Sequence, residues 1–525
     1  MKTKKLICLG VAAALAASLC SCGGKQTSKT NGAQSELPET KYGDTYPIQS
    51  DKTLTMWSHL PVDPQYTNLG DMPMFQELKK RTGINVEYKS PIGAHKEQFN
   101  LLIASGDYPD IIGYDWFVCM GNPSKPIEDN IIIPLNDVID KYAPNLKGLL
   151  EKYPNQAKQH RTDEGVYFGF PGLTSEEEEN WESLSIYQGP IINETLFEKY
   201  NIEKPTTIDE WYNALTTLKN NGVKYPLSIE GKSLKNPGHD SFLFGAYNTC
   251  YSYYIDDDGK VTYGPIEPAF KEALMTYNKW YEEGLLDAEF VSTDGTLIQR
   301  KITDGSAAAT VGYVSRIALW GIESDFNYGG IPYPTLNKGE TPEFGQLAMG
   351  GGYAYYNAIS TQCEDIELAA RYLDYAYTEE GVRLHNYGIE GITYEMVDGV
   401  EVFHDDILQN FEKVNPYSVL YASVSEKNRA DQRNRLPAQQ EALVTWKTNM
   451  EKHGMPAVTP TAEESDMMAE YDTEIQTYVE EMVLKFITGN ESFDNYDAFV
   501  ANIKALGIDE VLASKQEQLE RFKNR

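Results

Sequence analysis

Apolar residues in the first part of the chain follow two spacings in turn, and each spacing predicts a different element. In residues 53–56 and 84–88 every second position is apolar, which is the period of a strand. Between them the apolar residues recur at helical spacing up to Gly83. A second helix that ends at Gly106 and a strand at 110–112 continue the alternation. This order of elements predicts an α/β sheet.

Two later segments have the pattern of amphipathic helices. Thr207 and Glu210 form a capping box at the start of the first, whose apolar face includes Trp211. Trp280 lies on the apolar face of the second, which ends at a glycine. Both tryptophans are therefore expected in the core. Between the two helices, the sequence YYIDDDGKVTYG predicts a hairpin with its turn at 258–259.

The N-terminus is typical of an exported lipoprotein. Three lysines among the first five residues precede an apolar run at 6–19, which is too short to span a membrane as a mature helix. The run ends in Leu-Cys-Ser-Cys, which resembles the bacterial lipobox, and Cys22 fits the modified position because a small residue precedes it. A plain signal peptide with an incidental cysteine is the alternative. We expect a signal peptide at 1–21 and palmitate-containing lipid on Cys22.

The segment that follows contains few apolar residues. Residues 22–50 are rich in Gly, Ser, Thr, Asn, Gln and Lys, and such a stretch cannot bury enough surface to become ordered. We expect a flexible linker that holds the mature chain at the extracytoplasmic face of the cell membrane through lipid alone. The remaining cysteines, Cys119, Cys250 and Cys363, are an odd set without zinc-site spacing, so they form no disulfide framework.

The chain is strongly acidic, and its charge narrows the range of partners. It contains 46 Lys and Arg against 78 Asp and Glu, a formal net charge of −32. Such a charge disfavours binding to nucleic acid and adhesion to anionic lipid. It also favours a neutral or cationic ligand over an anionic one. We expect a soluble, monomeric mature chain.

Aromatic and acidic side chains stand where two of the predicted strands end. Trp57 closes the first strand, and Asp115 and Trp116 close the third. In open α/β sheets ligands bind beyond the carboxyl ends of the strands, so these side chains are expected along one edge of the same sheet. The alternative for each tryptophan is that it covers the local core.

Several segments, taken in order, resemble the extracellular solute-binding lipoproteins of ABC importers, in the branch linked to oligosaccharides. They are RTGINVEY, ASGDYPDII, DEGVYFGFPG, ETLFEKYNIEKPTTIDEWYNALTTLK, KWYEEGLLDAEF, DYAYTEEGVRLHNYGIEGITYE and KFITGNESFDNYDAFVANIKALGIDE. The resemblance covers nearly the whole mature chain. The segment IYQGPIINETLF departs from it, because the R-x-D-W often found at that position is missing.

The resemblance implies a two-lobed, periplasmic-binding-protein-like α/β fold with a ligand cleft between the lobes. The implied first lobe comprises residues 51–170 and 306–360. The second comprises 171–305 and 361–525, including the C-terminal helices. The implied partners are ABC permease subunits and a separate ATPase, because the chain itself contains no phosphate-binding loop.

The implied ligand is an extracellular oligosaccharide. Sugar rings offer a C–H face to aromatic side chains and a rim of hydroxyls to carboxylates and amides. The candidate ligand-binding residues are Trp57, Asp115, Trp116, Trp181, Trp320, Tyr353 and Glu390. For Glu390, a solvated turn residue is an equal alternative. A peptide-binding receptor of the same fold is the alternative for the chain as a whole.

The sequence contains no enzymatic motif. It lacks HExxH, GxSxG and GxxxxGK[ST], and its seven histidines have no metal-ligand spacing. The acidic run at 256–258 lacks the ligand spacing of an EF-hand, so calcium is expected there only as a weak surface site, and no cofactor is expected. A surface-anchored glycoside hydrolase is the enzymatic alternative. Among 78 acidic residues some pair will always resemble its catalytic carboxylates, so abundance alone does not favour it.

Overall fold

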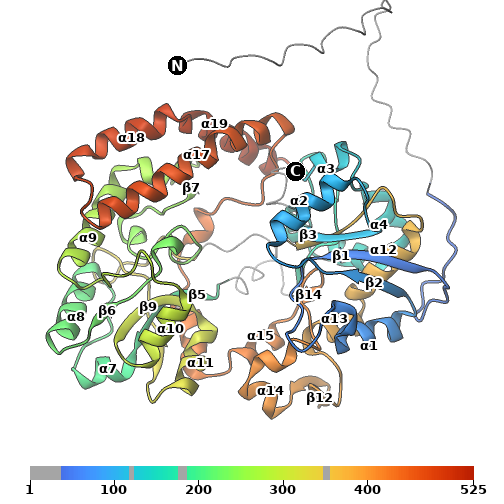
Figure 1. Cartoon of the computed structure of the whole chain (residues 1–525), viewed down its shortest axis with the longest axis horizontal. Coiled ribbons are helices and arrows are strands. Elements are labelled where there is room, and N and C mark those ends of the chain that lie inside the picture. Colours follow the sequence, from blue (N-terminus) through green and yellow to red (C-terminus); the bar gives the residue numbers. More distant parts are fainter. Residues whose placement is uncertain (1–36, 117–122, 176–185, 347–354) are drawn as a thin grey trace, which may run out of the picture. The chain divides into compact units, whose positions relative to one another are not determined.

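The computed structural model describes residues 37–116, 123–175, 186–346 and 355–525. Four residues named above lie outside these ranges: Cys22, Cys119, Trp181 and Tyr353. In the described ranges the strands form two four-stranded sheets and three two-stranded ones, and helices alternate with strands along the chain (Figure 1). All elements below belong to one unit, residues 40–525.

The first sheet has the strand order β11-β3-β1-β2. Its strands are β1 (Thr53–Ser58), β2 (Asn85–Lys89), β3 (Ile111–Asp115) and β11 (Tyr355–Ile359). β1 pairs in parallel with β2 and β3, and β11 runs antiparallel to β3. The three parallel strands are those that the alternating pattern predicted. Their parallel pairing places the carboxyl ends of β1 and β3 side by side.

Two helices make the crossovers between these strands. α1 (Pro73–Thr82) connects β1 to β2, and α2 (His95–Ser105) connects β2 to β3. Both helices end at the predicted glycines, since Gly83 and Gly106 have positive φ angles of 74° and 67°. At Gly83 a Cβ atom would lie 2.3 Å from the carbonyl oxygen of Ile48, so a side chain does not fit there.

Further helices belong to the same part of the fold. They are α3 (Lys125–Glu128), α4 (Asn136–Tyr142), α5 (Pro144–Lys152), α6 (Pro154–Gln159), α12 (Ile366–Asp374) and α13 (Glu379–Tyr387). α12 contacts both β11 and α4, so the chain remains with the first sheet after residue 365.

The second sheet has the strand order β10-β5-β9-β6. Its strands are β5 (Gln188–Asn193), β6 (Tyr225–Leu227), β9 (Ala307–Tyr313) and β10 (Tyr328–Gly330). β5 runs antiparallel to β9 and β10, and β6 runs parallel to β9. The accompanying helices are α7 (Glu194–Lys199), α8 (Ile208–Asn220), α9 (Pro268–Glu282), α10 (Gly295–Thr303), α11 (Val314–Glu323) and α16 (Pro437–Thr445).

Strand pairing divides the chain differently from the lobe boundaries that the sequence suggests. The sequence places residues 306–360 in the first lobe, but β9 and β10 pair with β5 in the second sheet and only β11 joins the first. It places residues 361–525 in the second lobe, but α12 packs on β11. An alternating pattern predicts that a strand forms. The partner of that strand depends on side chains that are distant in sequence, which the pattern does not report.

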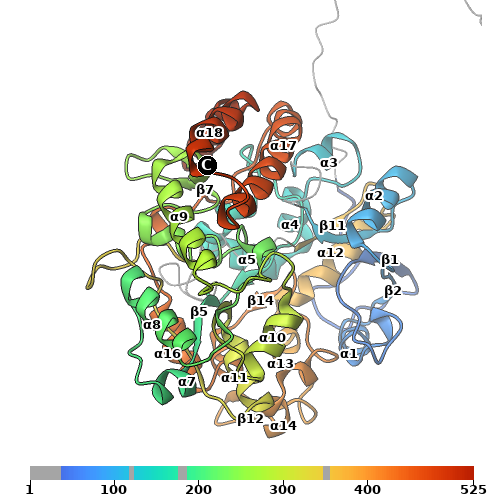
Figure 2. The same ribbon diagram turned by 60° about the vertical axis from the view of Figure 1, so that its left-hand side comes forward.

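Three C-terminal helices pack in the second part of the fold. They are α17 (Ala462–Ile487), α18 (Tyr496–Ala505) and α19 (Ile508–Lys523). α17 contacts α9, α18 and α19, and Figure 2 shows α17 and α18 beside α9. Their apolar faces share one core with α8 and α9, in which Trp211 and Trp280 are 0% and 1% exposed. The core positions predicted for both tryptophans are confirmed.

The remaining strands form three short pairs. β7 (Tyr253–Ile255) and β8 (Val261–Tyr263) are antiparallel, which confirms the predicted hairpin. The other strands and their neighbouring helices are β4 (Leu173–Thr174), β12 (Tyr394–Val397), β13 (Val400–Phe403), β14 (Val424–Ser425), α14 (Asp405–Gln409) and α15 (Lys427–Arg433). β12 and β13 form a second hairpin, and β4 pairs in parallel with β14. None of the helices in the described ranges has the length and apolar character that crossing a membrane requires.

Thr207 begins α8 as predicted. Its hydroxyl oxygen accepts a hydrogen bond from the backbone N–H of Glu210 at 3.2 Å. The Glu210 carboxylate accepts the backbone N–H of Thr206 at 2.9 Å, so it bonds one residue earlier than a capping box requires.

Asp240 is a buried carboxyl group in the second part of the fold. Burial raises its pKa from 3.8 to about 7, although the hydroxyls of Ser252 and Ser241 donate hydrogen bonds to it at 3.1 and 3.3 Å. The folded state therefore keeps a proton that the unfolded chain releases at lower pH. This contribution to stability is complete below the unfolded pKa and is lost as the pH rises towards 7.

We therefore expect the stability of the wild type to fall relative to that of Asp240→Asn as the pH rises. Between about pH 5 and about pH 6 the difference in the free energy of unfolding should change by about 1.4 kcal/mol. Urea unfolding of both proteins at each pH measures it. The other titrating groups cancel in the comparison, including neighbouring His239, whose pKa burial lowers to about 4. A difference that does not vary with pH would contradict a titrating Asp240.

Candidate ligand-binding site

Polar side chains meet at the edge of the first sheet where β1 and β3 end. Ser58 is the last residue of β1, Asp115 is the last of β3, and Tyr355 begins the antiparallel β11. The hydroxyls of Ser58 and Tyr355 lie 2.8 Å apart. His59 Nε2 lies 3.5 Å from a carboxylate oxygen of Asp115, whose side chain is 32% exposed. Asp115 therefore stands at the sheet edge where the sequence placed it.

Aromatic rings hold His59 in position at this edge. Its ring stacks on that of His95 with centroids 4.9 Å apart, and it meets Tyr114 edge-on at 4.8 Å. The Nδ1 atom of His59 is buried and has no hydrogen-bond partner among the described residues. Packing therefore sets the orientation of the imidazole and leaves Nε2 directed at Asp115.

The predicted tryptophans in the described ranges occupy packed cores. Trp57 and Trp116 share one apolar cluster and are 7% and 0% exposed, and the indole N–H of Trp116 donates to a carbonyl oxygen of β3. Trp320 lies on α11 in another cluster and is 3% exposed. Helices cover a largely parallel sheet, so apolar side chains near the strand ends can pack against them instead of facing solvent. None of these three indoles offers an open face in this structure, and Glu390 is exposed and forms an isolated β-bridge with Tyr394.

Two tyrosines mark an edge of the second sheet. β5 begins at Gln188 and the antiparallel β9 ends at Tyr313, and these two residues are register partners. The ring of Tyr187, just before β5, lies parallel to that of Tyr313, with centroids 5.7 Å apart and an angle of 2° between the planes. Tyr313 is 48% exposed. A flat ring that is open on one side is a surface on which the C–H face of a sugar can stack.

Backbone hydrogen bonds hold the segment on which each ring stands. The buried Oε1 atom of Gln346 accepts the N–H groups of both Tyr187 and Gln188, each at 2.7 Å. The carbonyl oxygen of Tyr187 accepts the N–H of Val314 at 2.8 Å, directly after Tyr313. The ring pair is therefore preorganised by bonds that do not use the rings.

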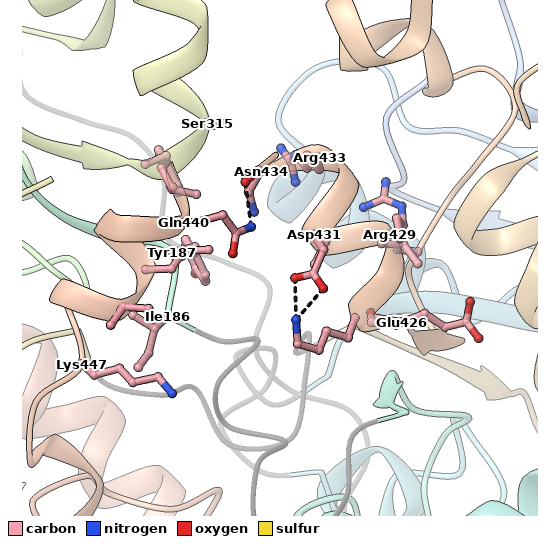
Figure 3. Close-up of a pocket in the computed structure, with 18 residues that line it drawn as sticks. Ile186, Tyr187, Ser315, Glu426, Arg429, Asp431, Arg433, Asn434, Gln440 and Lys447 are labelled. Atoms are coloured by element: carbon pink, nitrogen blue, oxygen red, sulfur yellow. Dashed lines mark hydrogen bonds and ion pairs between the residues drawn. The ribbon is translucent and has the colours of Figure 1, made fainter. Parts of the chain in front are cut away.

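A cavity of about 520 Å³ lies beside the tyrosine pair (Figure 3). Pockets for small ligands occupy about 300 to 1,000 Å³, so a short oligosaccharide is of suitable size. Its walls include the residues just before β5, the end of β9, the start of α11, and α15 and α16. The polar side chains that line it include Lys427, Arg429, Asp431, Arg433, Gln440 and Lys447.

Polar side chains attach α15 to the part of the fold that contains the first sheet. Asn428 Nδ2 donates to the Tyr387 hydroxyl and to the Glu401 carbonyl oxygen, each at 3.0 Å. Arg429 Nε donates to the carbonyl oxygen of Asn386 at 2.9 Å. These acceptors belong to the end of α13 and to β13, so α15 is anchored on those two elements.

α16 is anchored on the second sheet instead. Trp446, just after the helix, donates its indole N–H to the carbonyl oxygen of Pro190 in β5 at 3.2 Å. Two glycines allow this close packing. A Cβ atom at Gly189 would lie 2.5 Å from the Trp446 ring, and one at Gly330 would lie 2.4 Å from Cβ of Ala442. Strands without side chains at these points let the helix lie directly against them.

Residues 434–436 connect the two anchored helices. Gln440 Nε2 donates to the carbonyl oxygen of Asn434 at 2.8 Å, and the N–H of Leu436 donates to Gln439 Oε1 at 3.2 Å. The two helical walls of the cavity are thus anchored on different elements, α15 on α13 and β13, and α16 on the second sheet. A short connection of this kind is where a hinge absorbs a change of backbone angles.

Both carboxylates of the cavity wall have partners. A carboxylate oxygen of Asp431 lies 2.5 Å from Nζ of Lys427, one turn earlier on α15. The carboxyl group of Glu426 is partly buried and hydrogen-bonded to Tyr387, and burial raises its pKa. Among the described residues, no group of three or more His, Cys, Asp or Glu side chains is placed to hold a metal ion. The cavity therefore offers a ligand the tyrosine rings, amides and cations beside apolar side chains such as Ile186 and Leu443.

Sequence reasoning missed Tyr187, Tyr313 and α15. The two tyrosines are among 36 in the chain and belong to no motif. One signal was available, because both stand at strand ends, which is the criterion that selected Asp115. α15 has no such signal, since tertiary packing alone brings it to the tyrosines.

The sequence of the chain is similar to those of known bacterial proteins. Residues 67–383 match the model of a family described as bacterial extracellular solute-binding protein. The chain is 25% identical over 538 residues to the fructooligosaccharide ABC transporter substrate-binding protein FusA of Streptococcus pneumoniae serotype 4. The matched region covers 96% of each chain. It is 20% identical to the polygalacturonan/rhamnogalacturonan-binding protein YtcQ of Bacillus subtilis over 333 residues, 61% of this chain and 63% of that one.

Solved structures share the fold. The structure of FusA from S. pneumoniae in complex with kestose has a TM-score of 0.76 at 21% identity, over 90% of this chain and 100% of that chain. The structure of the alginate-binding protein AlgQ2 without calcium ion has a TM-score of 0.72 at 21% identity, over 90% and 99%. These likenesses confirm the predicted α/β fold of the two-lobed, periplasmic-binding-protein-like class.

Proposed function

The chain belongs to the bacterial extracellular solute-binding protein family, and we propose that it captures an extracellular oligosaccharide for an ABC importer at the cavity beside Tyr187 and Tyr313. The observation that carries this proposal is the parallel tyrosine pair, because its exposed ring provides a stacking surface in a cavity whose walls are partly polar and partly apolar. The likeness to a fructooligosaccharide-binding component along nearly its full length supports the ligand class.

Each wall has a separate role in this proposal. A sugar ring stacks on Tyr313, and this stacking buries the apolar C–H face of the sugar. Sugar hydroxyls both donate and accept, so the Gln440 amide and the charged ends of the α15 side chains orient the ring. A change of backbone angles at 434–436 then brings α15 and α16 together around the ligand, so that the closed form is the one that the importer receives.

A thermal-shift screen of the mature chain against oligosaccharides and peptides tests this proposal. A ligand that binds only the folded state stabilises it by about 2.7 kcal/mol when its concentration is 100 times Kd. We therefore expect a higher melting temperature with at least one oligosaccharide. If only peptides raise the melting temperature, the chain is a peptide receptor of the same fold and not an oligosaccharide receptor.

One observation favours a glycoside hydrolase as the second candidate. Glu426, whose pKa is raised by burial, and Asp431, which is paired with a lysine, line the same cavity, and glycosidases use a pair of carboxyl groups. Both groups bond to protein partners, however, and the family is one of binding proteins. We therefore propose binding without catalysis.

Chromatography of oligosaccharides incubated with the pure chain separates the two candidates. Intact oligosaccharides are expected from the wild type. Products that disappear with Glu426→Gln would establish a hydrolase.

The N-terminal segment has the features of a lipoprotein signal. We propose that residues 1–21 are a signal peptide, that Cys22 carries the lipid, and that the linker 22–50 tethers a monomeric chain to the outer face of the cell membrane. The lysine-rich start, the apolar run and the lipobox support this assignment of the N-terminus. The permease and its ATPase are separate proteins in this arrangement, which fits the substrate-binding components of ABC transporters among the relatives.

Cys22→Ala is expected to abolish labelling of the protein by a fatty-acid analogue in growing cells, because no other cysteine fits the lipobox. Cys20→Ala is the matched control and should keep the label, since bulky Leu19 precedes Cys20. Gel fluorescence after metabolic labelling measures both. A labelled Cys22→Ala protein would disprove the assignment.

A further inference from the structure

The wall of the cavity is richer in cations than the chain as a whole. Among the described residues it contains Lys427, Arg429, Arg433 and Lys447 against the two carboxylates Glu426 and Asp431. The whole chain has 46 Lys and Arg for 78 Asp and Glu. A stretch of wall with the average composition would carry an excess of carboxylates, so cations are concentrated at this site.

The two carboxylates of the wall have partners other than Arg433 and Lys447. Asp431 pairs with Lys427, so these two charges cancel within one turn of α15. Glu426 is hydrogen-bonded to Tyr387, and burial raises the pKa of its carboxyl group. Neither carboxylate forms an ion pair with Arg433 or Lys447 in the described part of the chain.

Arg433 and Lys447 stand on different walls of the cavity. Arg433 is the last residue of α15, and its guanidinium lies 5.7 Å from the centroid of the Phe411 ring. Lys447 follows α16 and the anchoring residue Trp446. Figure 3 shows the two side chains coming from separate segments of the cavity wall, Arg433 from α15 and Lys447 from the residues after α16. Arg429 lines the same wall, and its Nε donates to the carbonyl oxygen of Asn386.

A neutral ligand and an anionic ligand would have different consequences for these side chains. Arg433 and Lys447 are exposed, so water solvates their charges in the structure described here. A bound ligand removes part of that water. A neutral sugar replaces it with hydroxyl hydrogen bonds only, whereas a carboxylate or sulfate also neutralises the charge and can bond a guanidinium through two parallel N–H groups. The wall therefore favours a ligand that combines rings with anionic groups.

We propose that the ligand is an acidic oligosaccharide, whose ring stacks on Tyr313 and whose carboxylate or sulfate groups pair with Arg433 and Lys447. This inference rests on the proposed oligosaccharide-binding function and adds its charge class. It reverses the expectation from net charge, which favoured a neutral or cationic ligand. Charges on distant surface are screened over about 8 Å at physiological ionic strength, so the groups that touch the ligand decide its preference.

Calorimetry with matched ligand pairs tests the charge class. Each pair shares its rings and linkages: uronic-acid oligosaccharides with their methyl esters, and sulfated oligosaccharides with their desulfated forms. Neutral fructo- and malto-oligosaccharides complete the panel. An acidic member is expected to bind at least about tenfold more tightly than its neutral partner, since a hydrogen bond to a charged group contributes on that scale. Its affinity should fall several-fold between low and high salt.

Single substitutions assign the effect to the two cations. Arg433→Gln and Lys447→Gln are each expected to weaken the acidic ligand by about tenfold and the neutral partner by less than about twofold. Arg300→Gln and Lys504→Gln remove the same charges from exposed positions that do not line the cavity, and they should change neither affinity. The melting temperature of each unliganded variant verifies that it is folded.

The outcomes separate this inference from the function on which it rests. Tighter binding of a neutral oligosaccharide than of every acidic one would overturn the inference and leave the oligosaccharide receptor standing. Equal losses for both members of a pair in Arg433→Gln and Lys447→Gln would also overturn it. If no oligosaccharide of either charge binds, the inference and the proposed function fail together.

Discussion

Replacing Trp116 with alanine is expected to lower the free energy of unfolding by about 3 to 5 kcal/mol. The indole is fully buried, meets the Phe99 ring edge-on at a centroid distance of 5.5 Å, and donates its N–H to the Ile112 carbonyl oxygen at 3.4 Å. Truncation leaves a cavity between β3 and α2, which a close-packed core cannot fill without strain. Urea unfolding of the unliganded proteins measures the loss.

Asp115→Asn is the matched control for this prediction. Asp115 is adjacent in sequence, but its side chain is 32% exposed, so the substitution is expected to change stability by less than about 1 kcal/mol. Calorimetric affinity on the same preparations separates core packing from ligand contact. If Trp116→Ala melts like the wild type but loses its ligand, the indole contacts the ligand and its assignment to the core is wrong.

Tyr313→Ala is expected to weaken oligosaccharide binding by roughly fifty- to a hundredfold. Aromatic stacking contributes about 1 kcal/mol beyond area burial, and burial of the ring face against the sugar adds about 1.5 kcal/mol. Their total of about 2.5 kcal/mol corresponds to that loss of affinity. Calorimetry with the oligosaccharide found in the thermal-shift screen measures it. Because Tyr313 is 48% exposed, stability should change by less than about 1 kcal/mol.

Tyr313→Phe is the control that isolates the ring. It keeps the stacking surface and removes only the hydroxyl, so most of the affinity should remain. Equal losses in Tyr313→Ala and Tyr313→Phe would show that the hydroxyl, not the ring face, binds the ligand. Unchanged affinity in Tyr313→Ala would move the ligand away from the tyrosine pair and contradict the site proposed here.

The sequence predicted the candidate site only in part. Asp115 stands at the expected sheet edge because the end of a parallel strand is a local feature that the pattern reports. Trp57 and Trp116 stand at the same edge, yet both are packed in the core. A strand pattern places a residue along the chain, but the depth of a side chain depends on the helices that cover the sheet.

The tyrosine pair and the cationic wall needed the tertiary structure. Tyr187 and Tyr313 come together because β5 and β9 are antiparallel neighbours, although 126 positions separate them in the numbering. Arg433 and Lys447 line one cavity because α15 and α16 are anchored on different parts of the fold. Net charge, a sum over the whole sequence, does not report this local excess of cations.

The sequence by itself determined the α/β alternation, the helix ends at Gly83 and Gly106, the hairpin between β7 and β8, and the burial of Trp211 and Trp280. These features depend on residues a few positions apart, because helix caps, tight turns and side-chain periodicity act within one or two turns of chain. Only the tertiary structure decided which sheet β9, β10 and α12 join and which side chains surround the cavity. Those outcomes come from packing between distant segments, whose free energy depends on complementary surfaces that no local pattern contains.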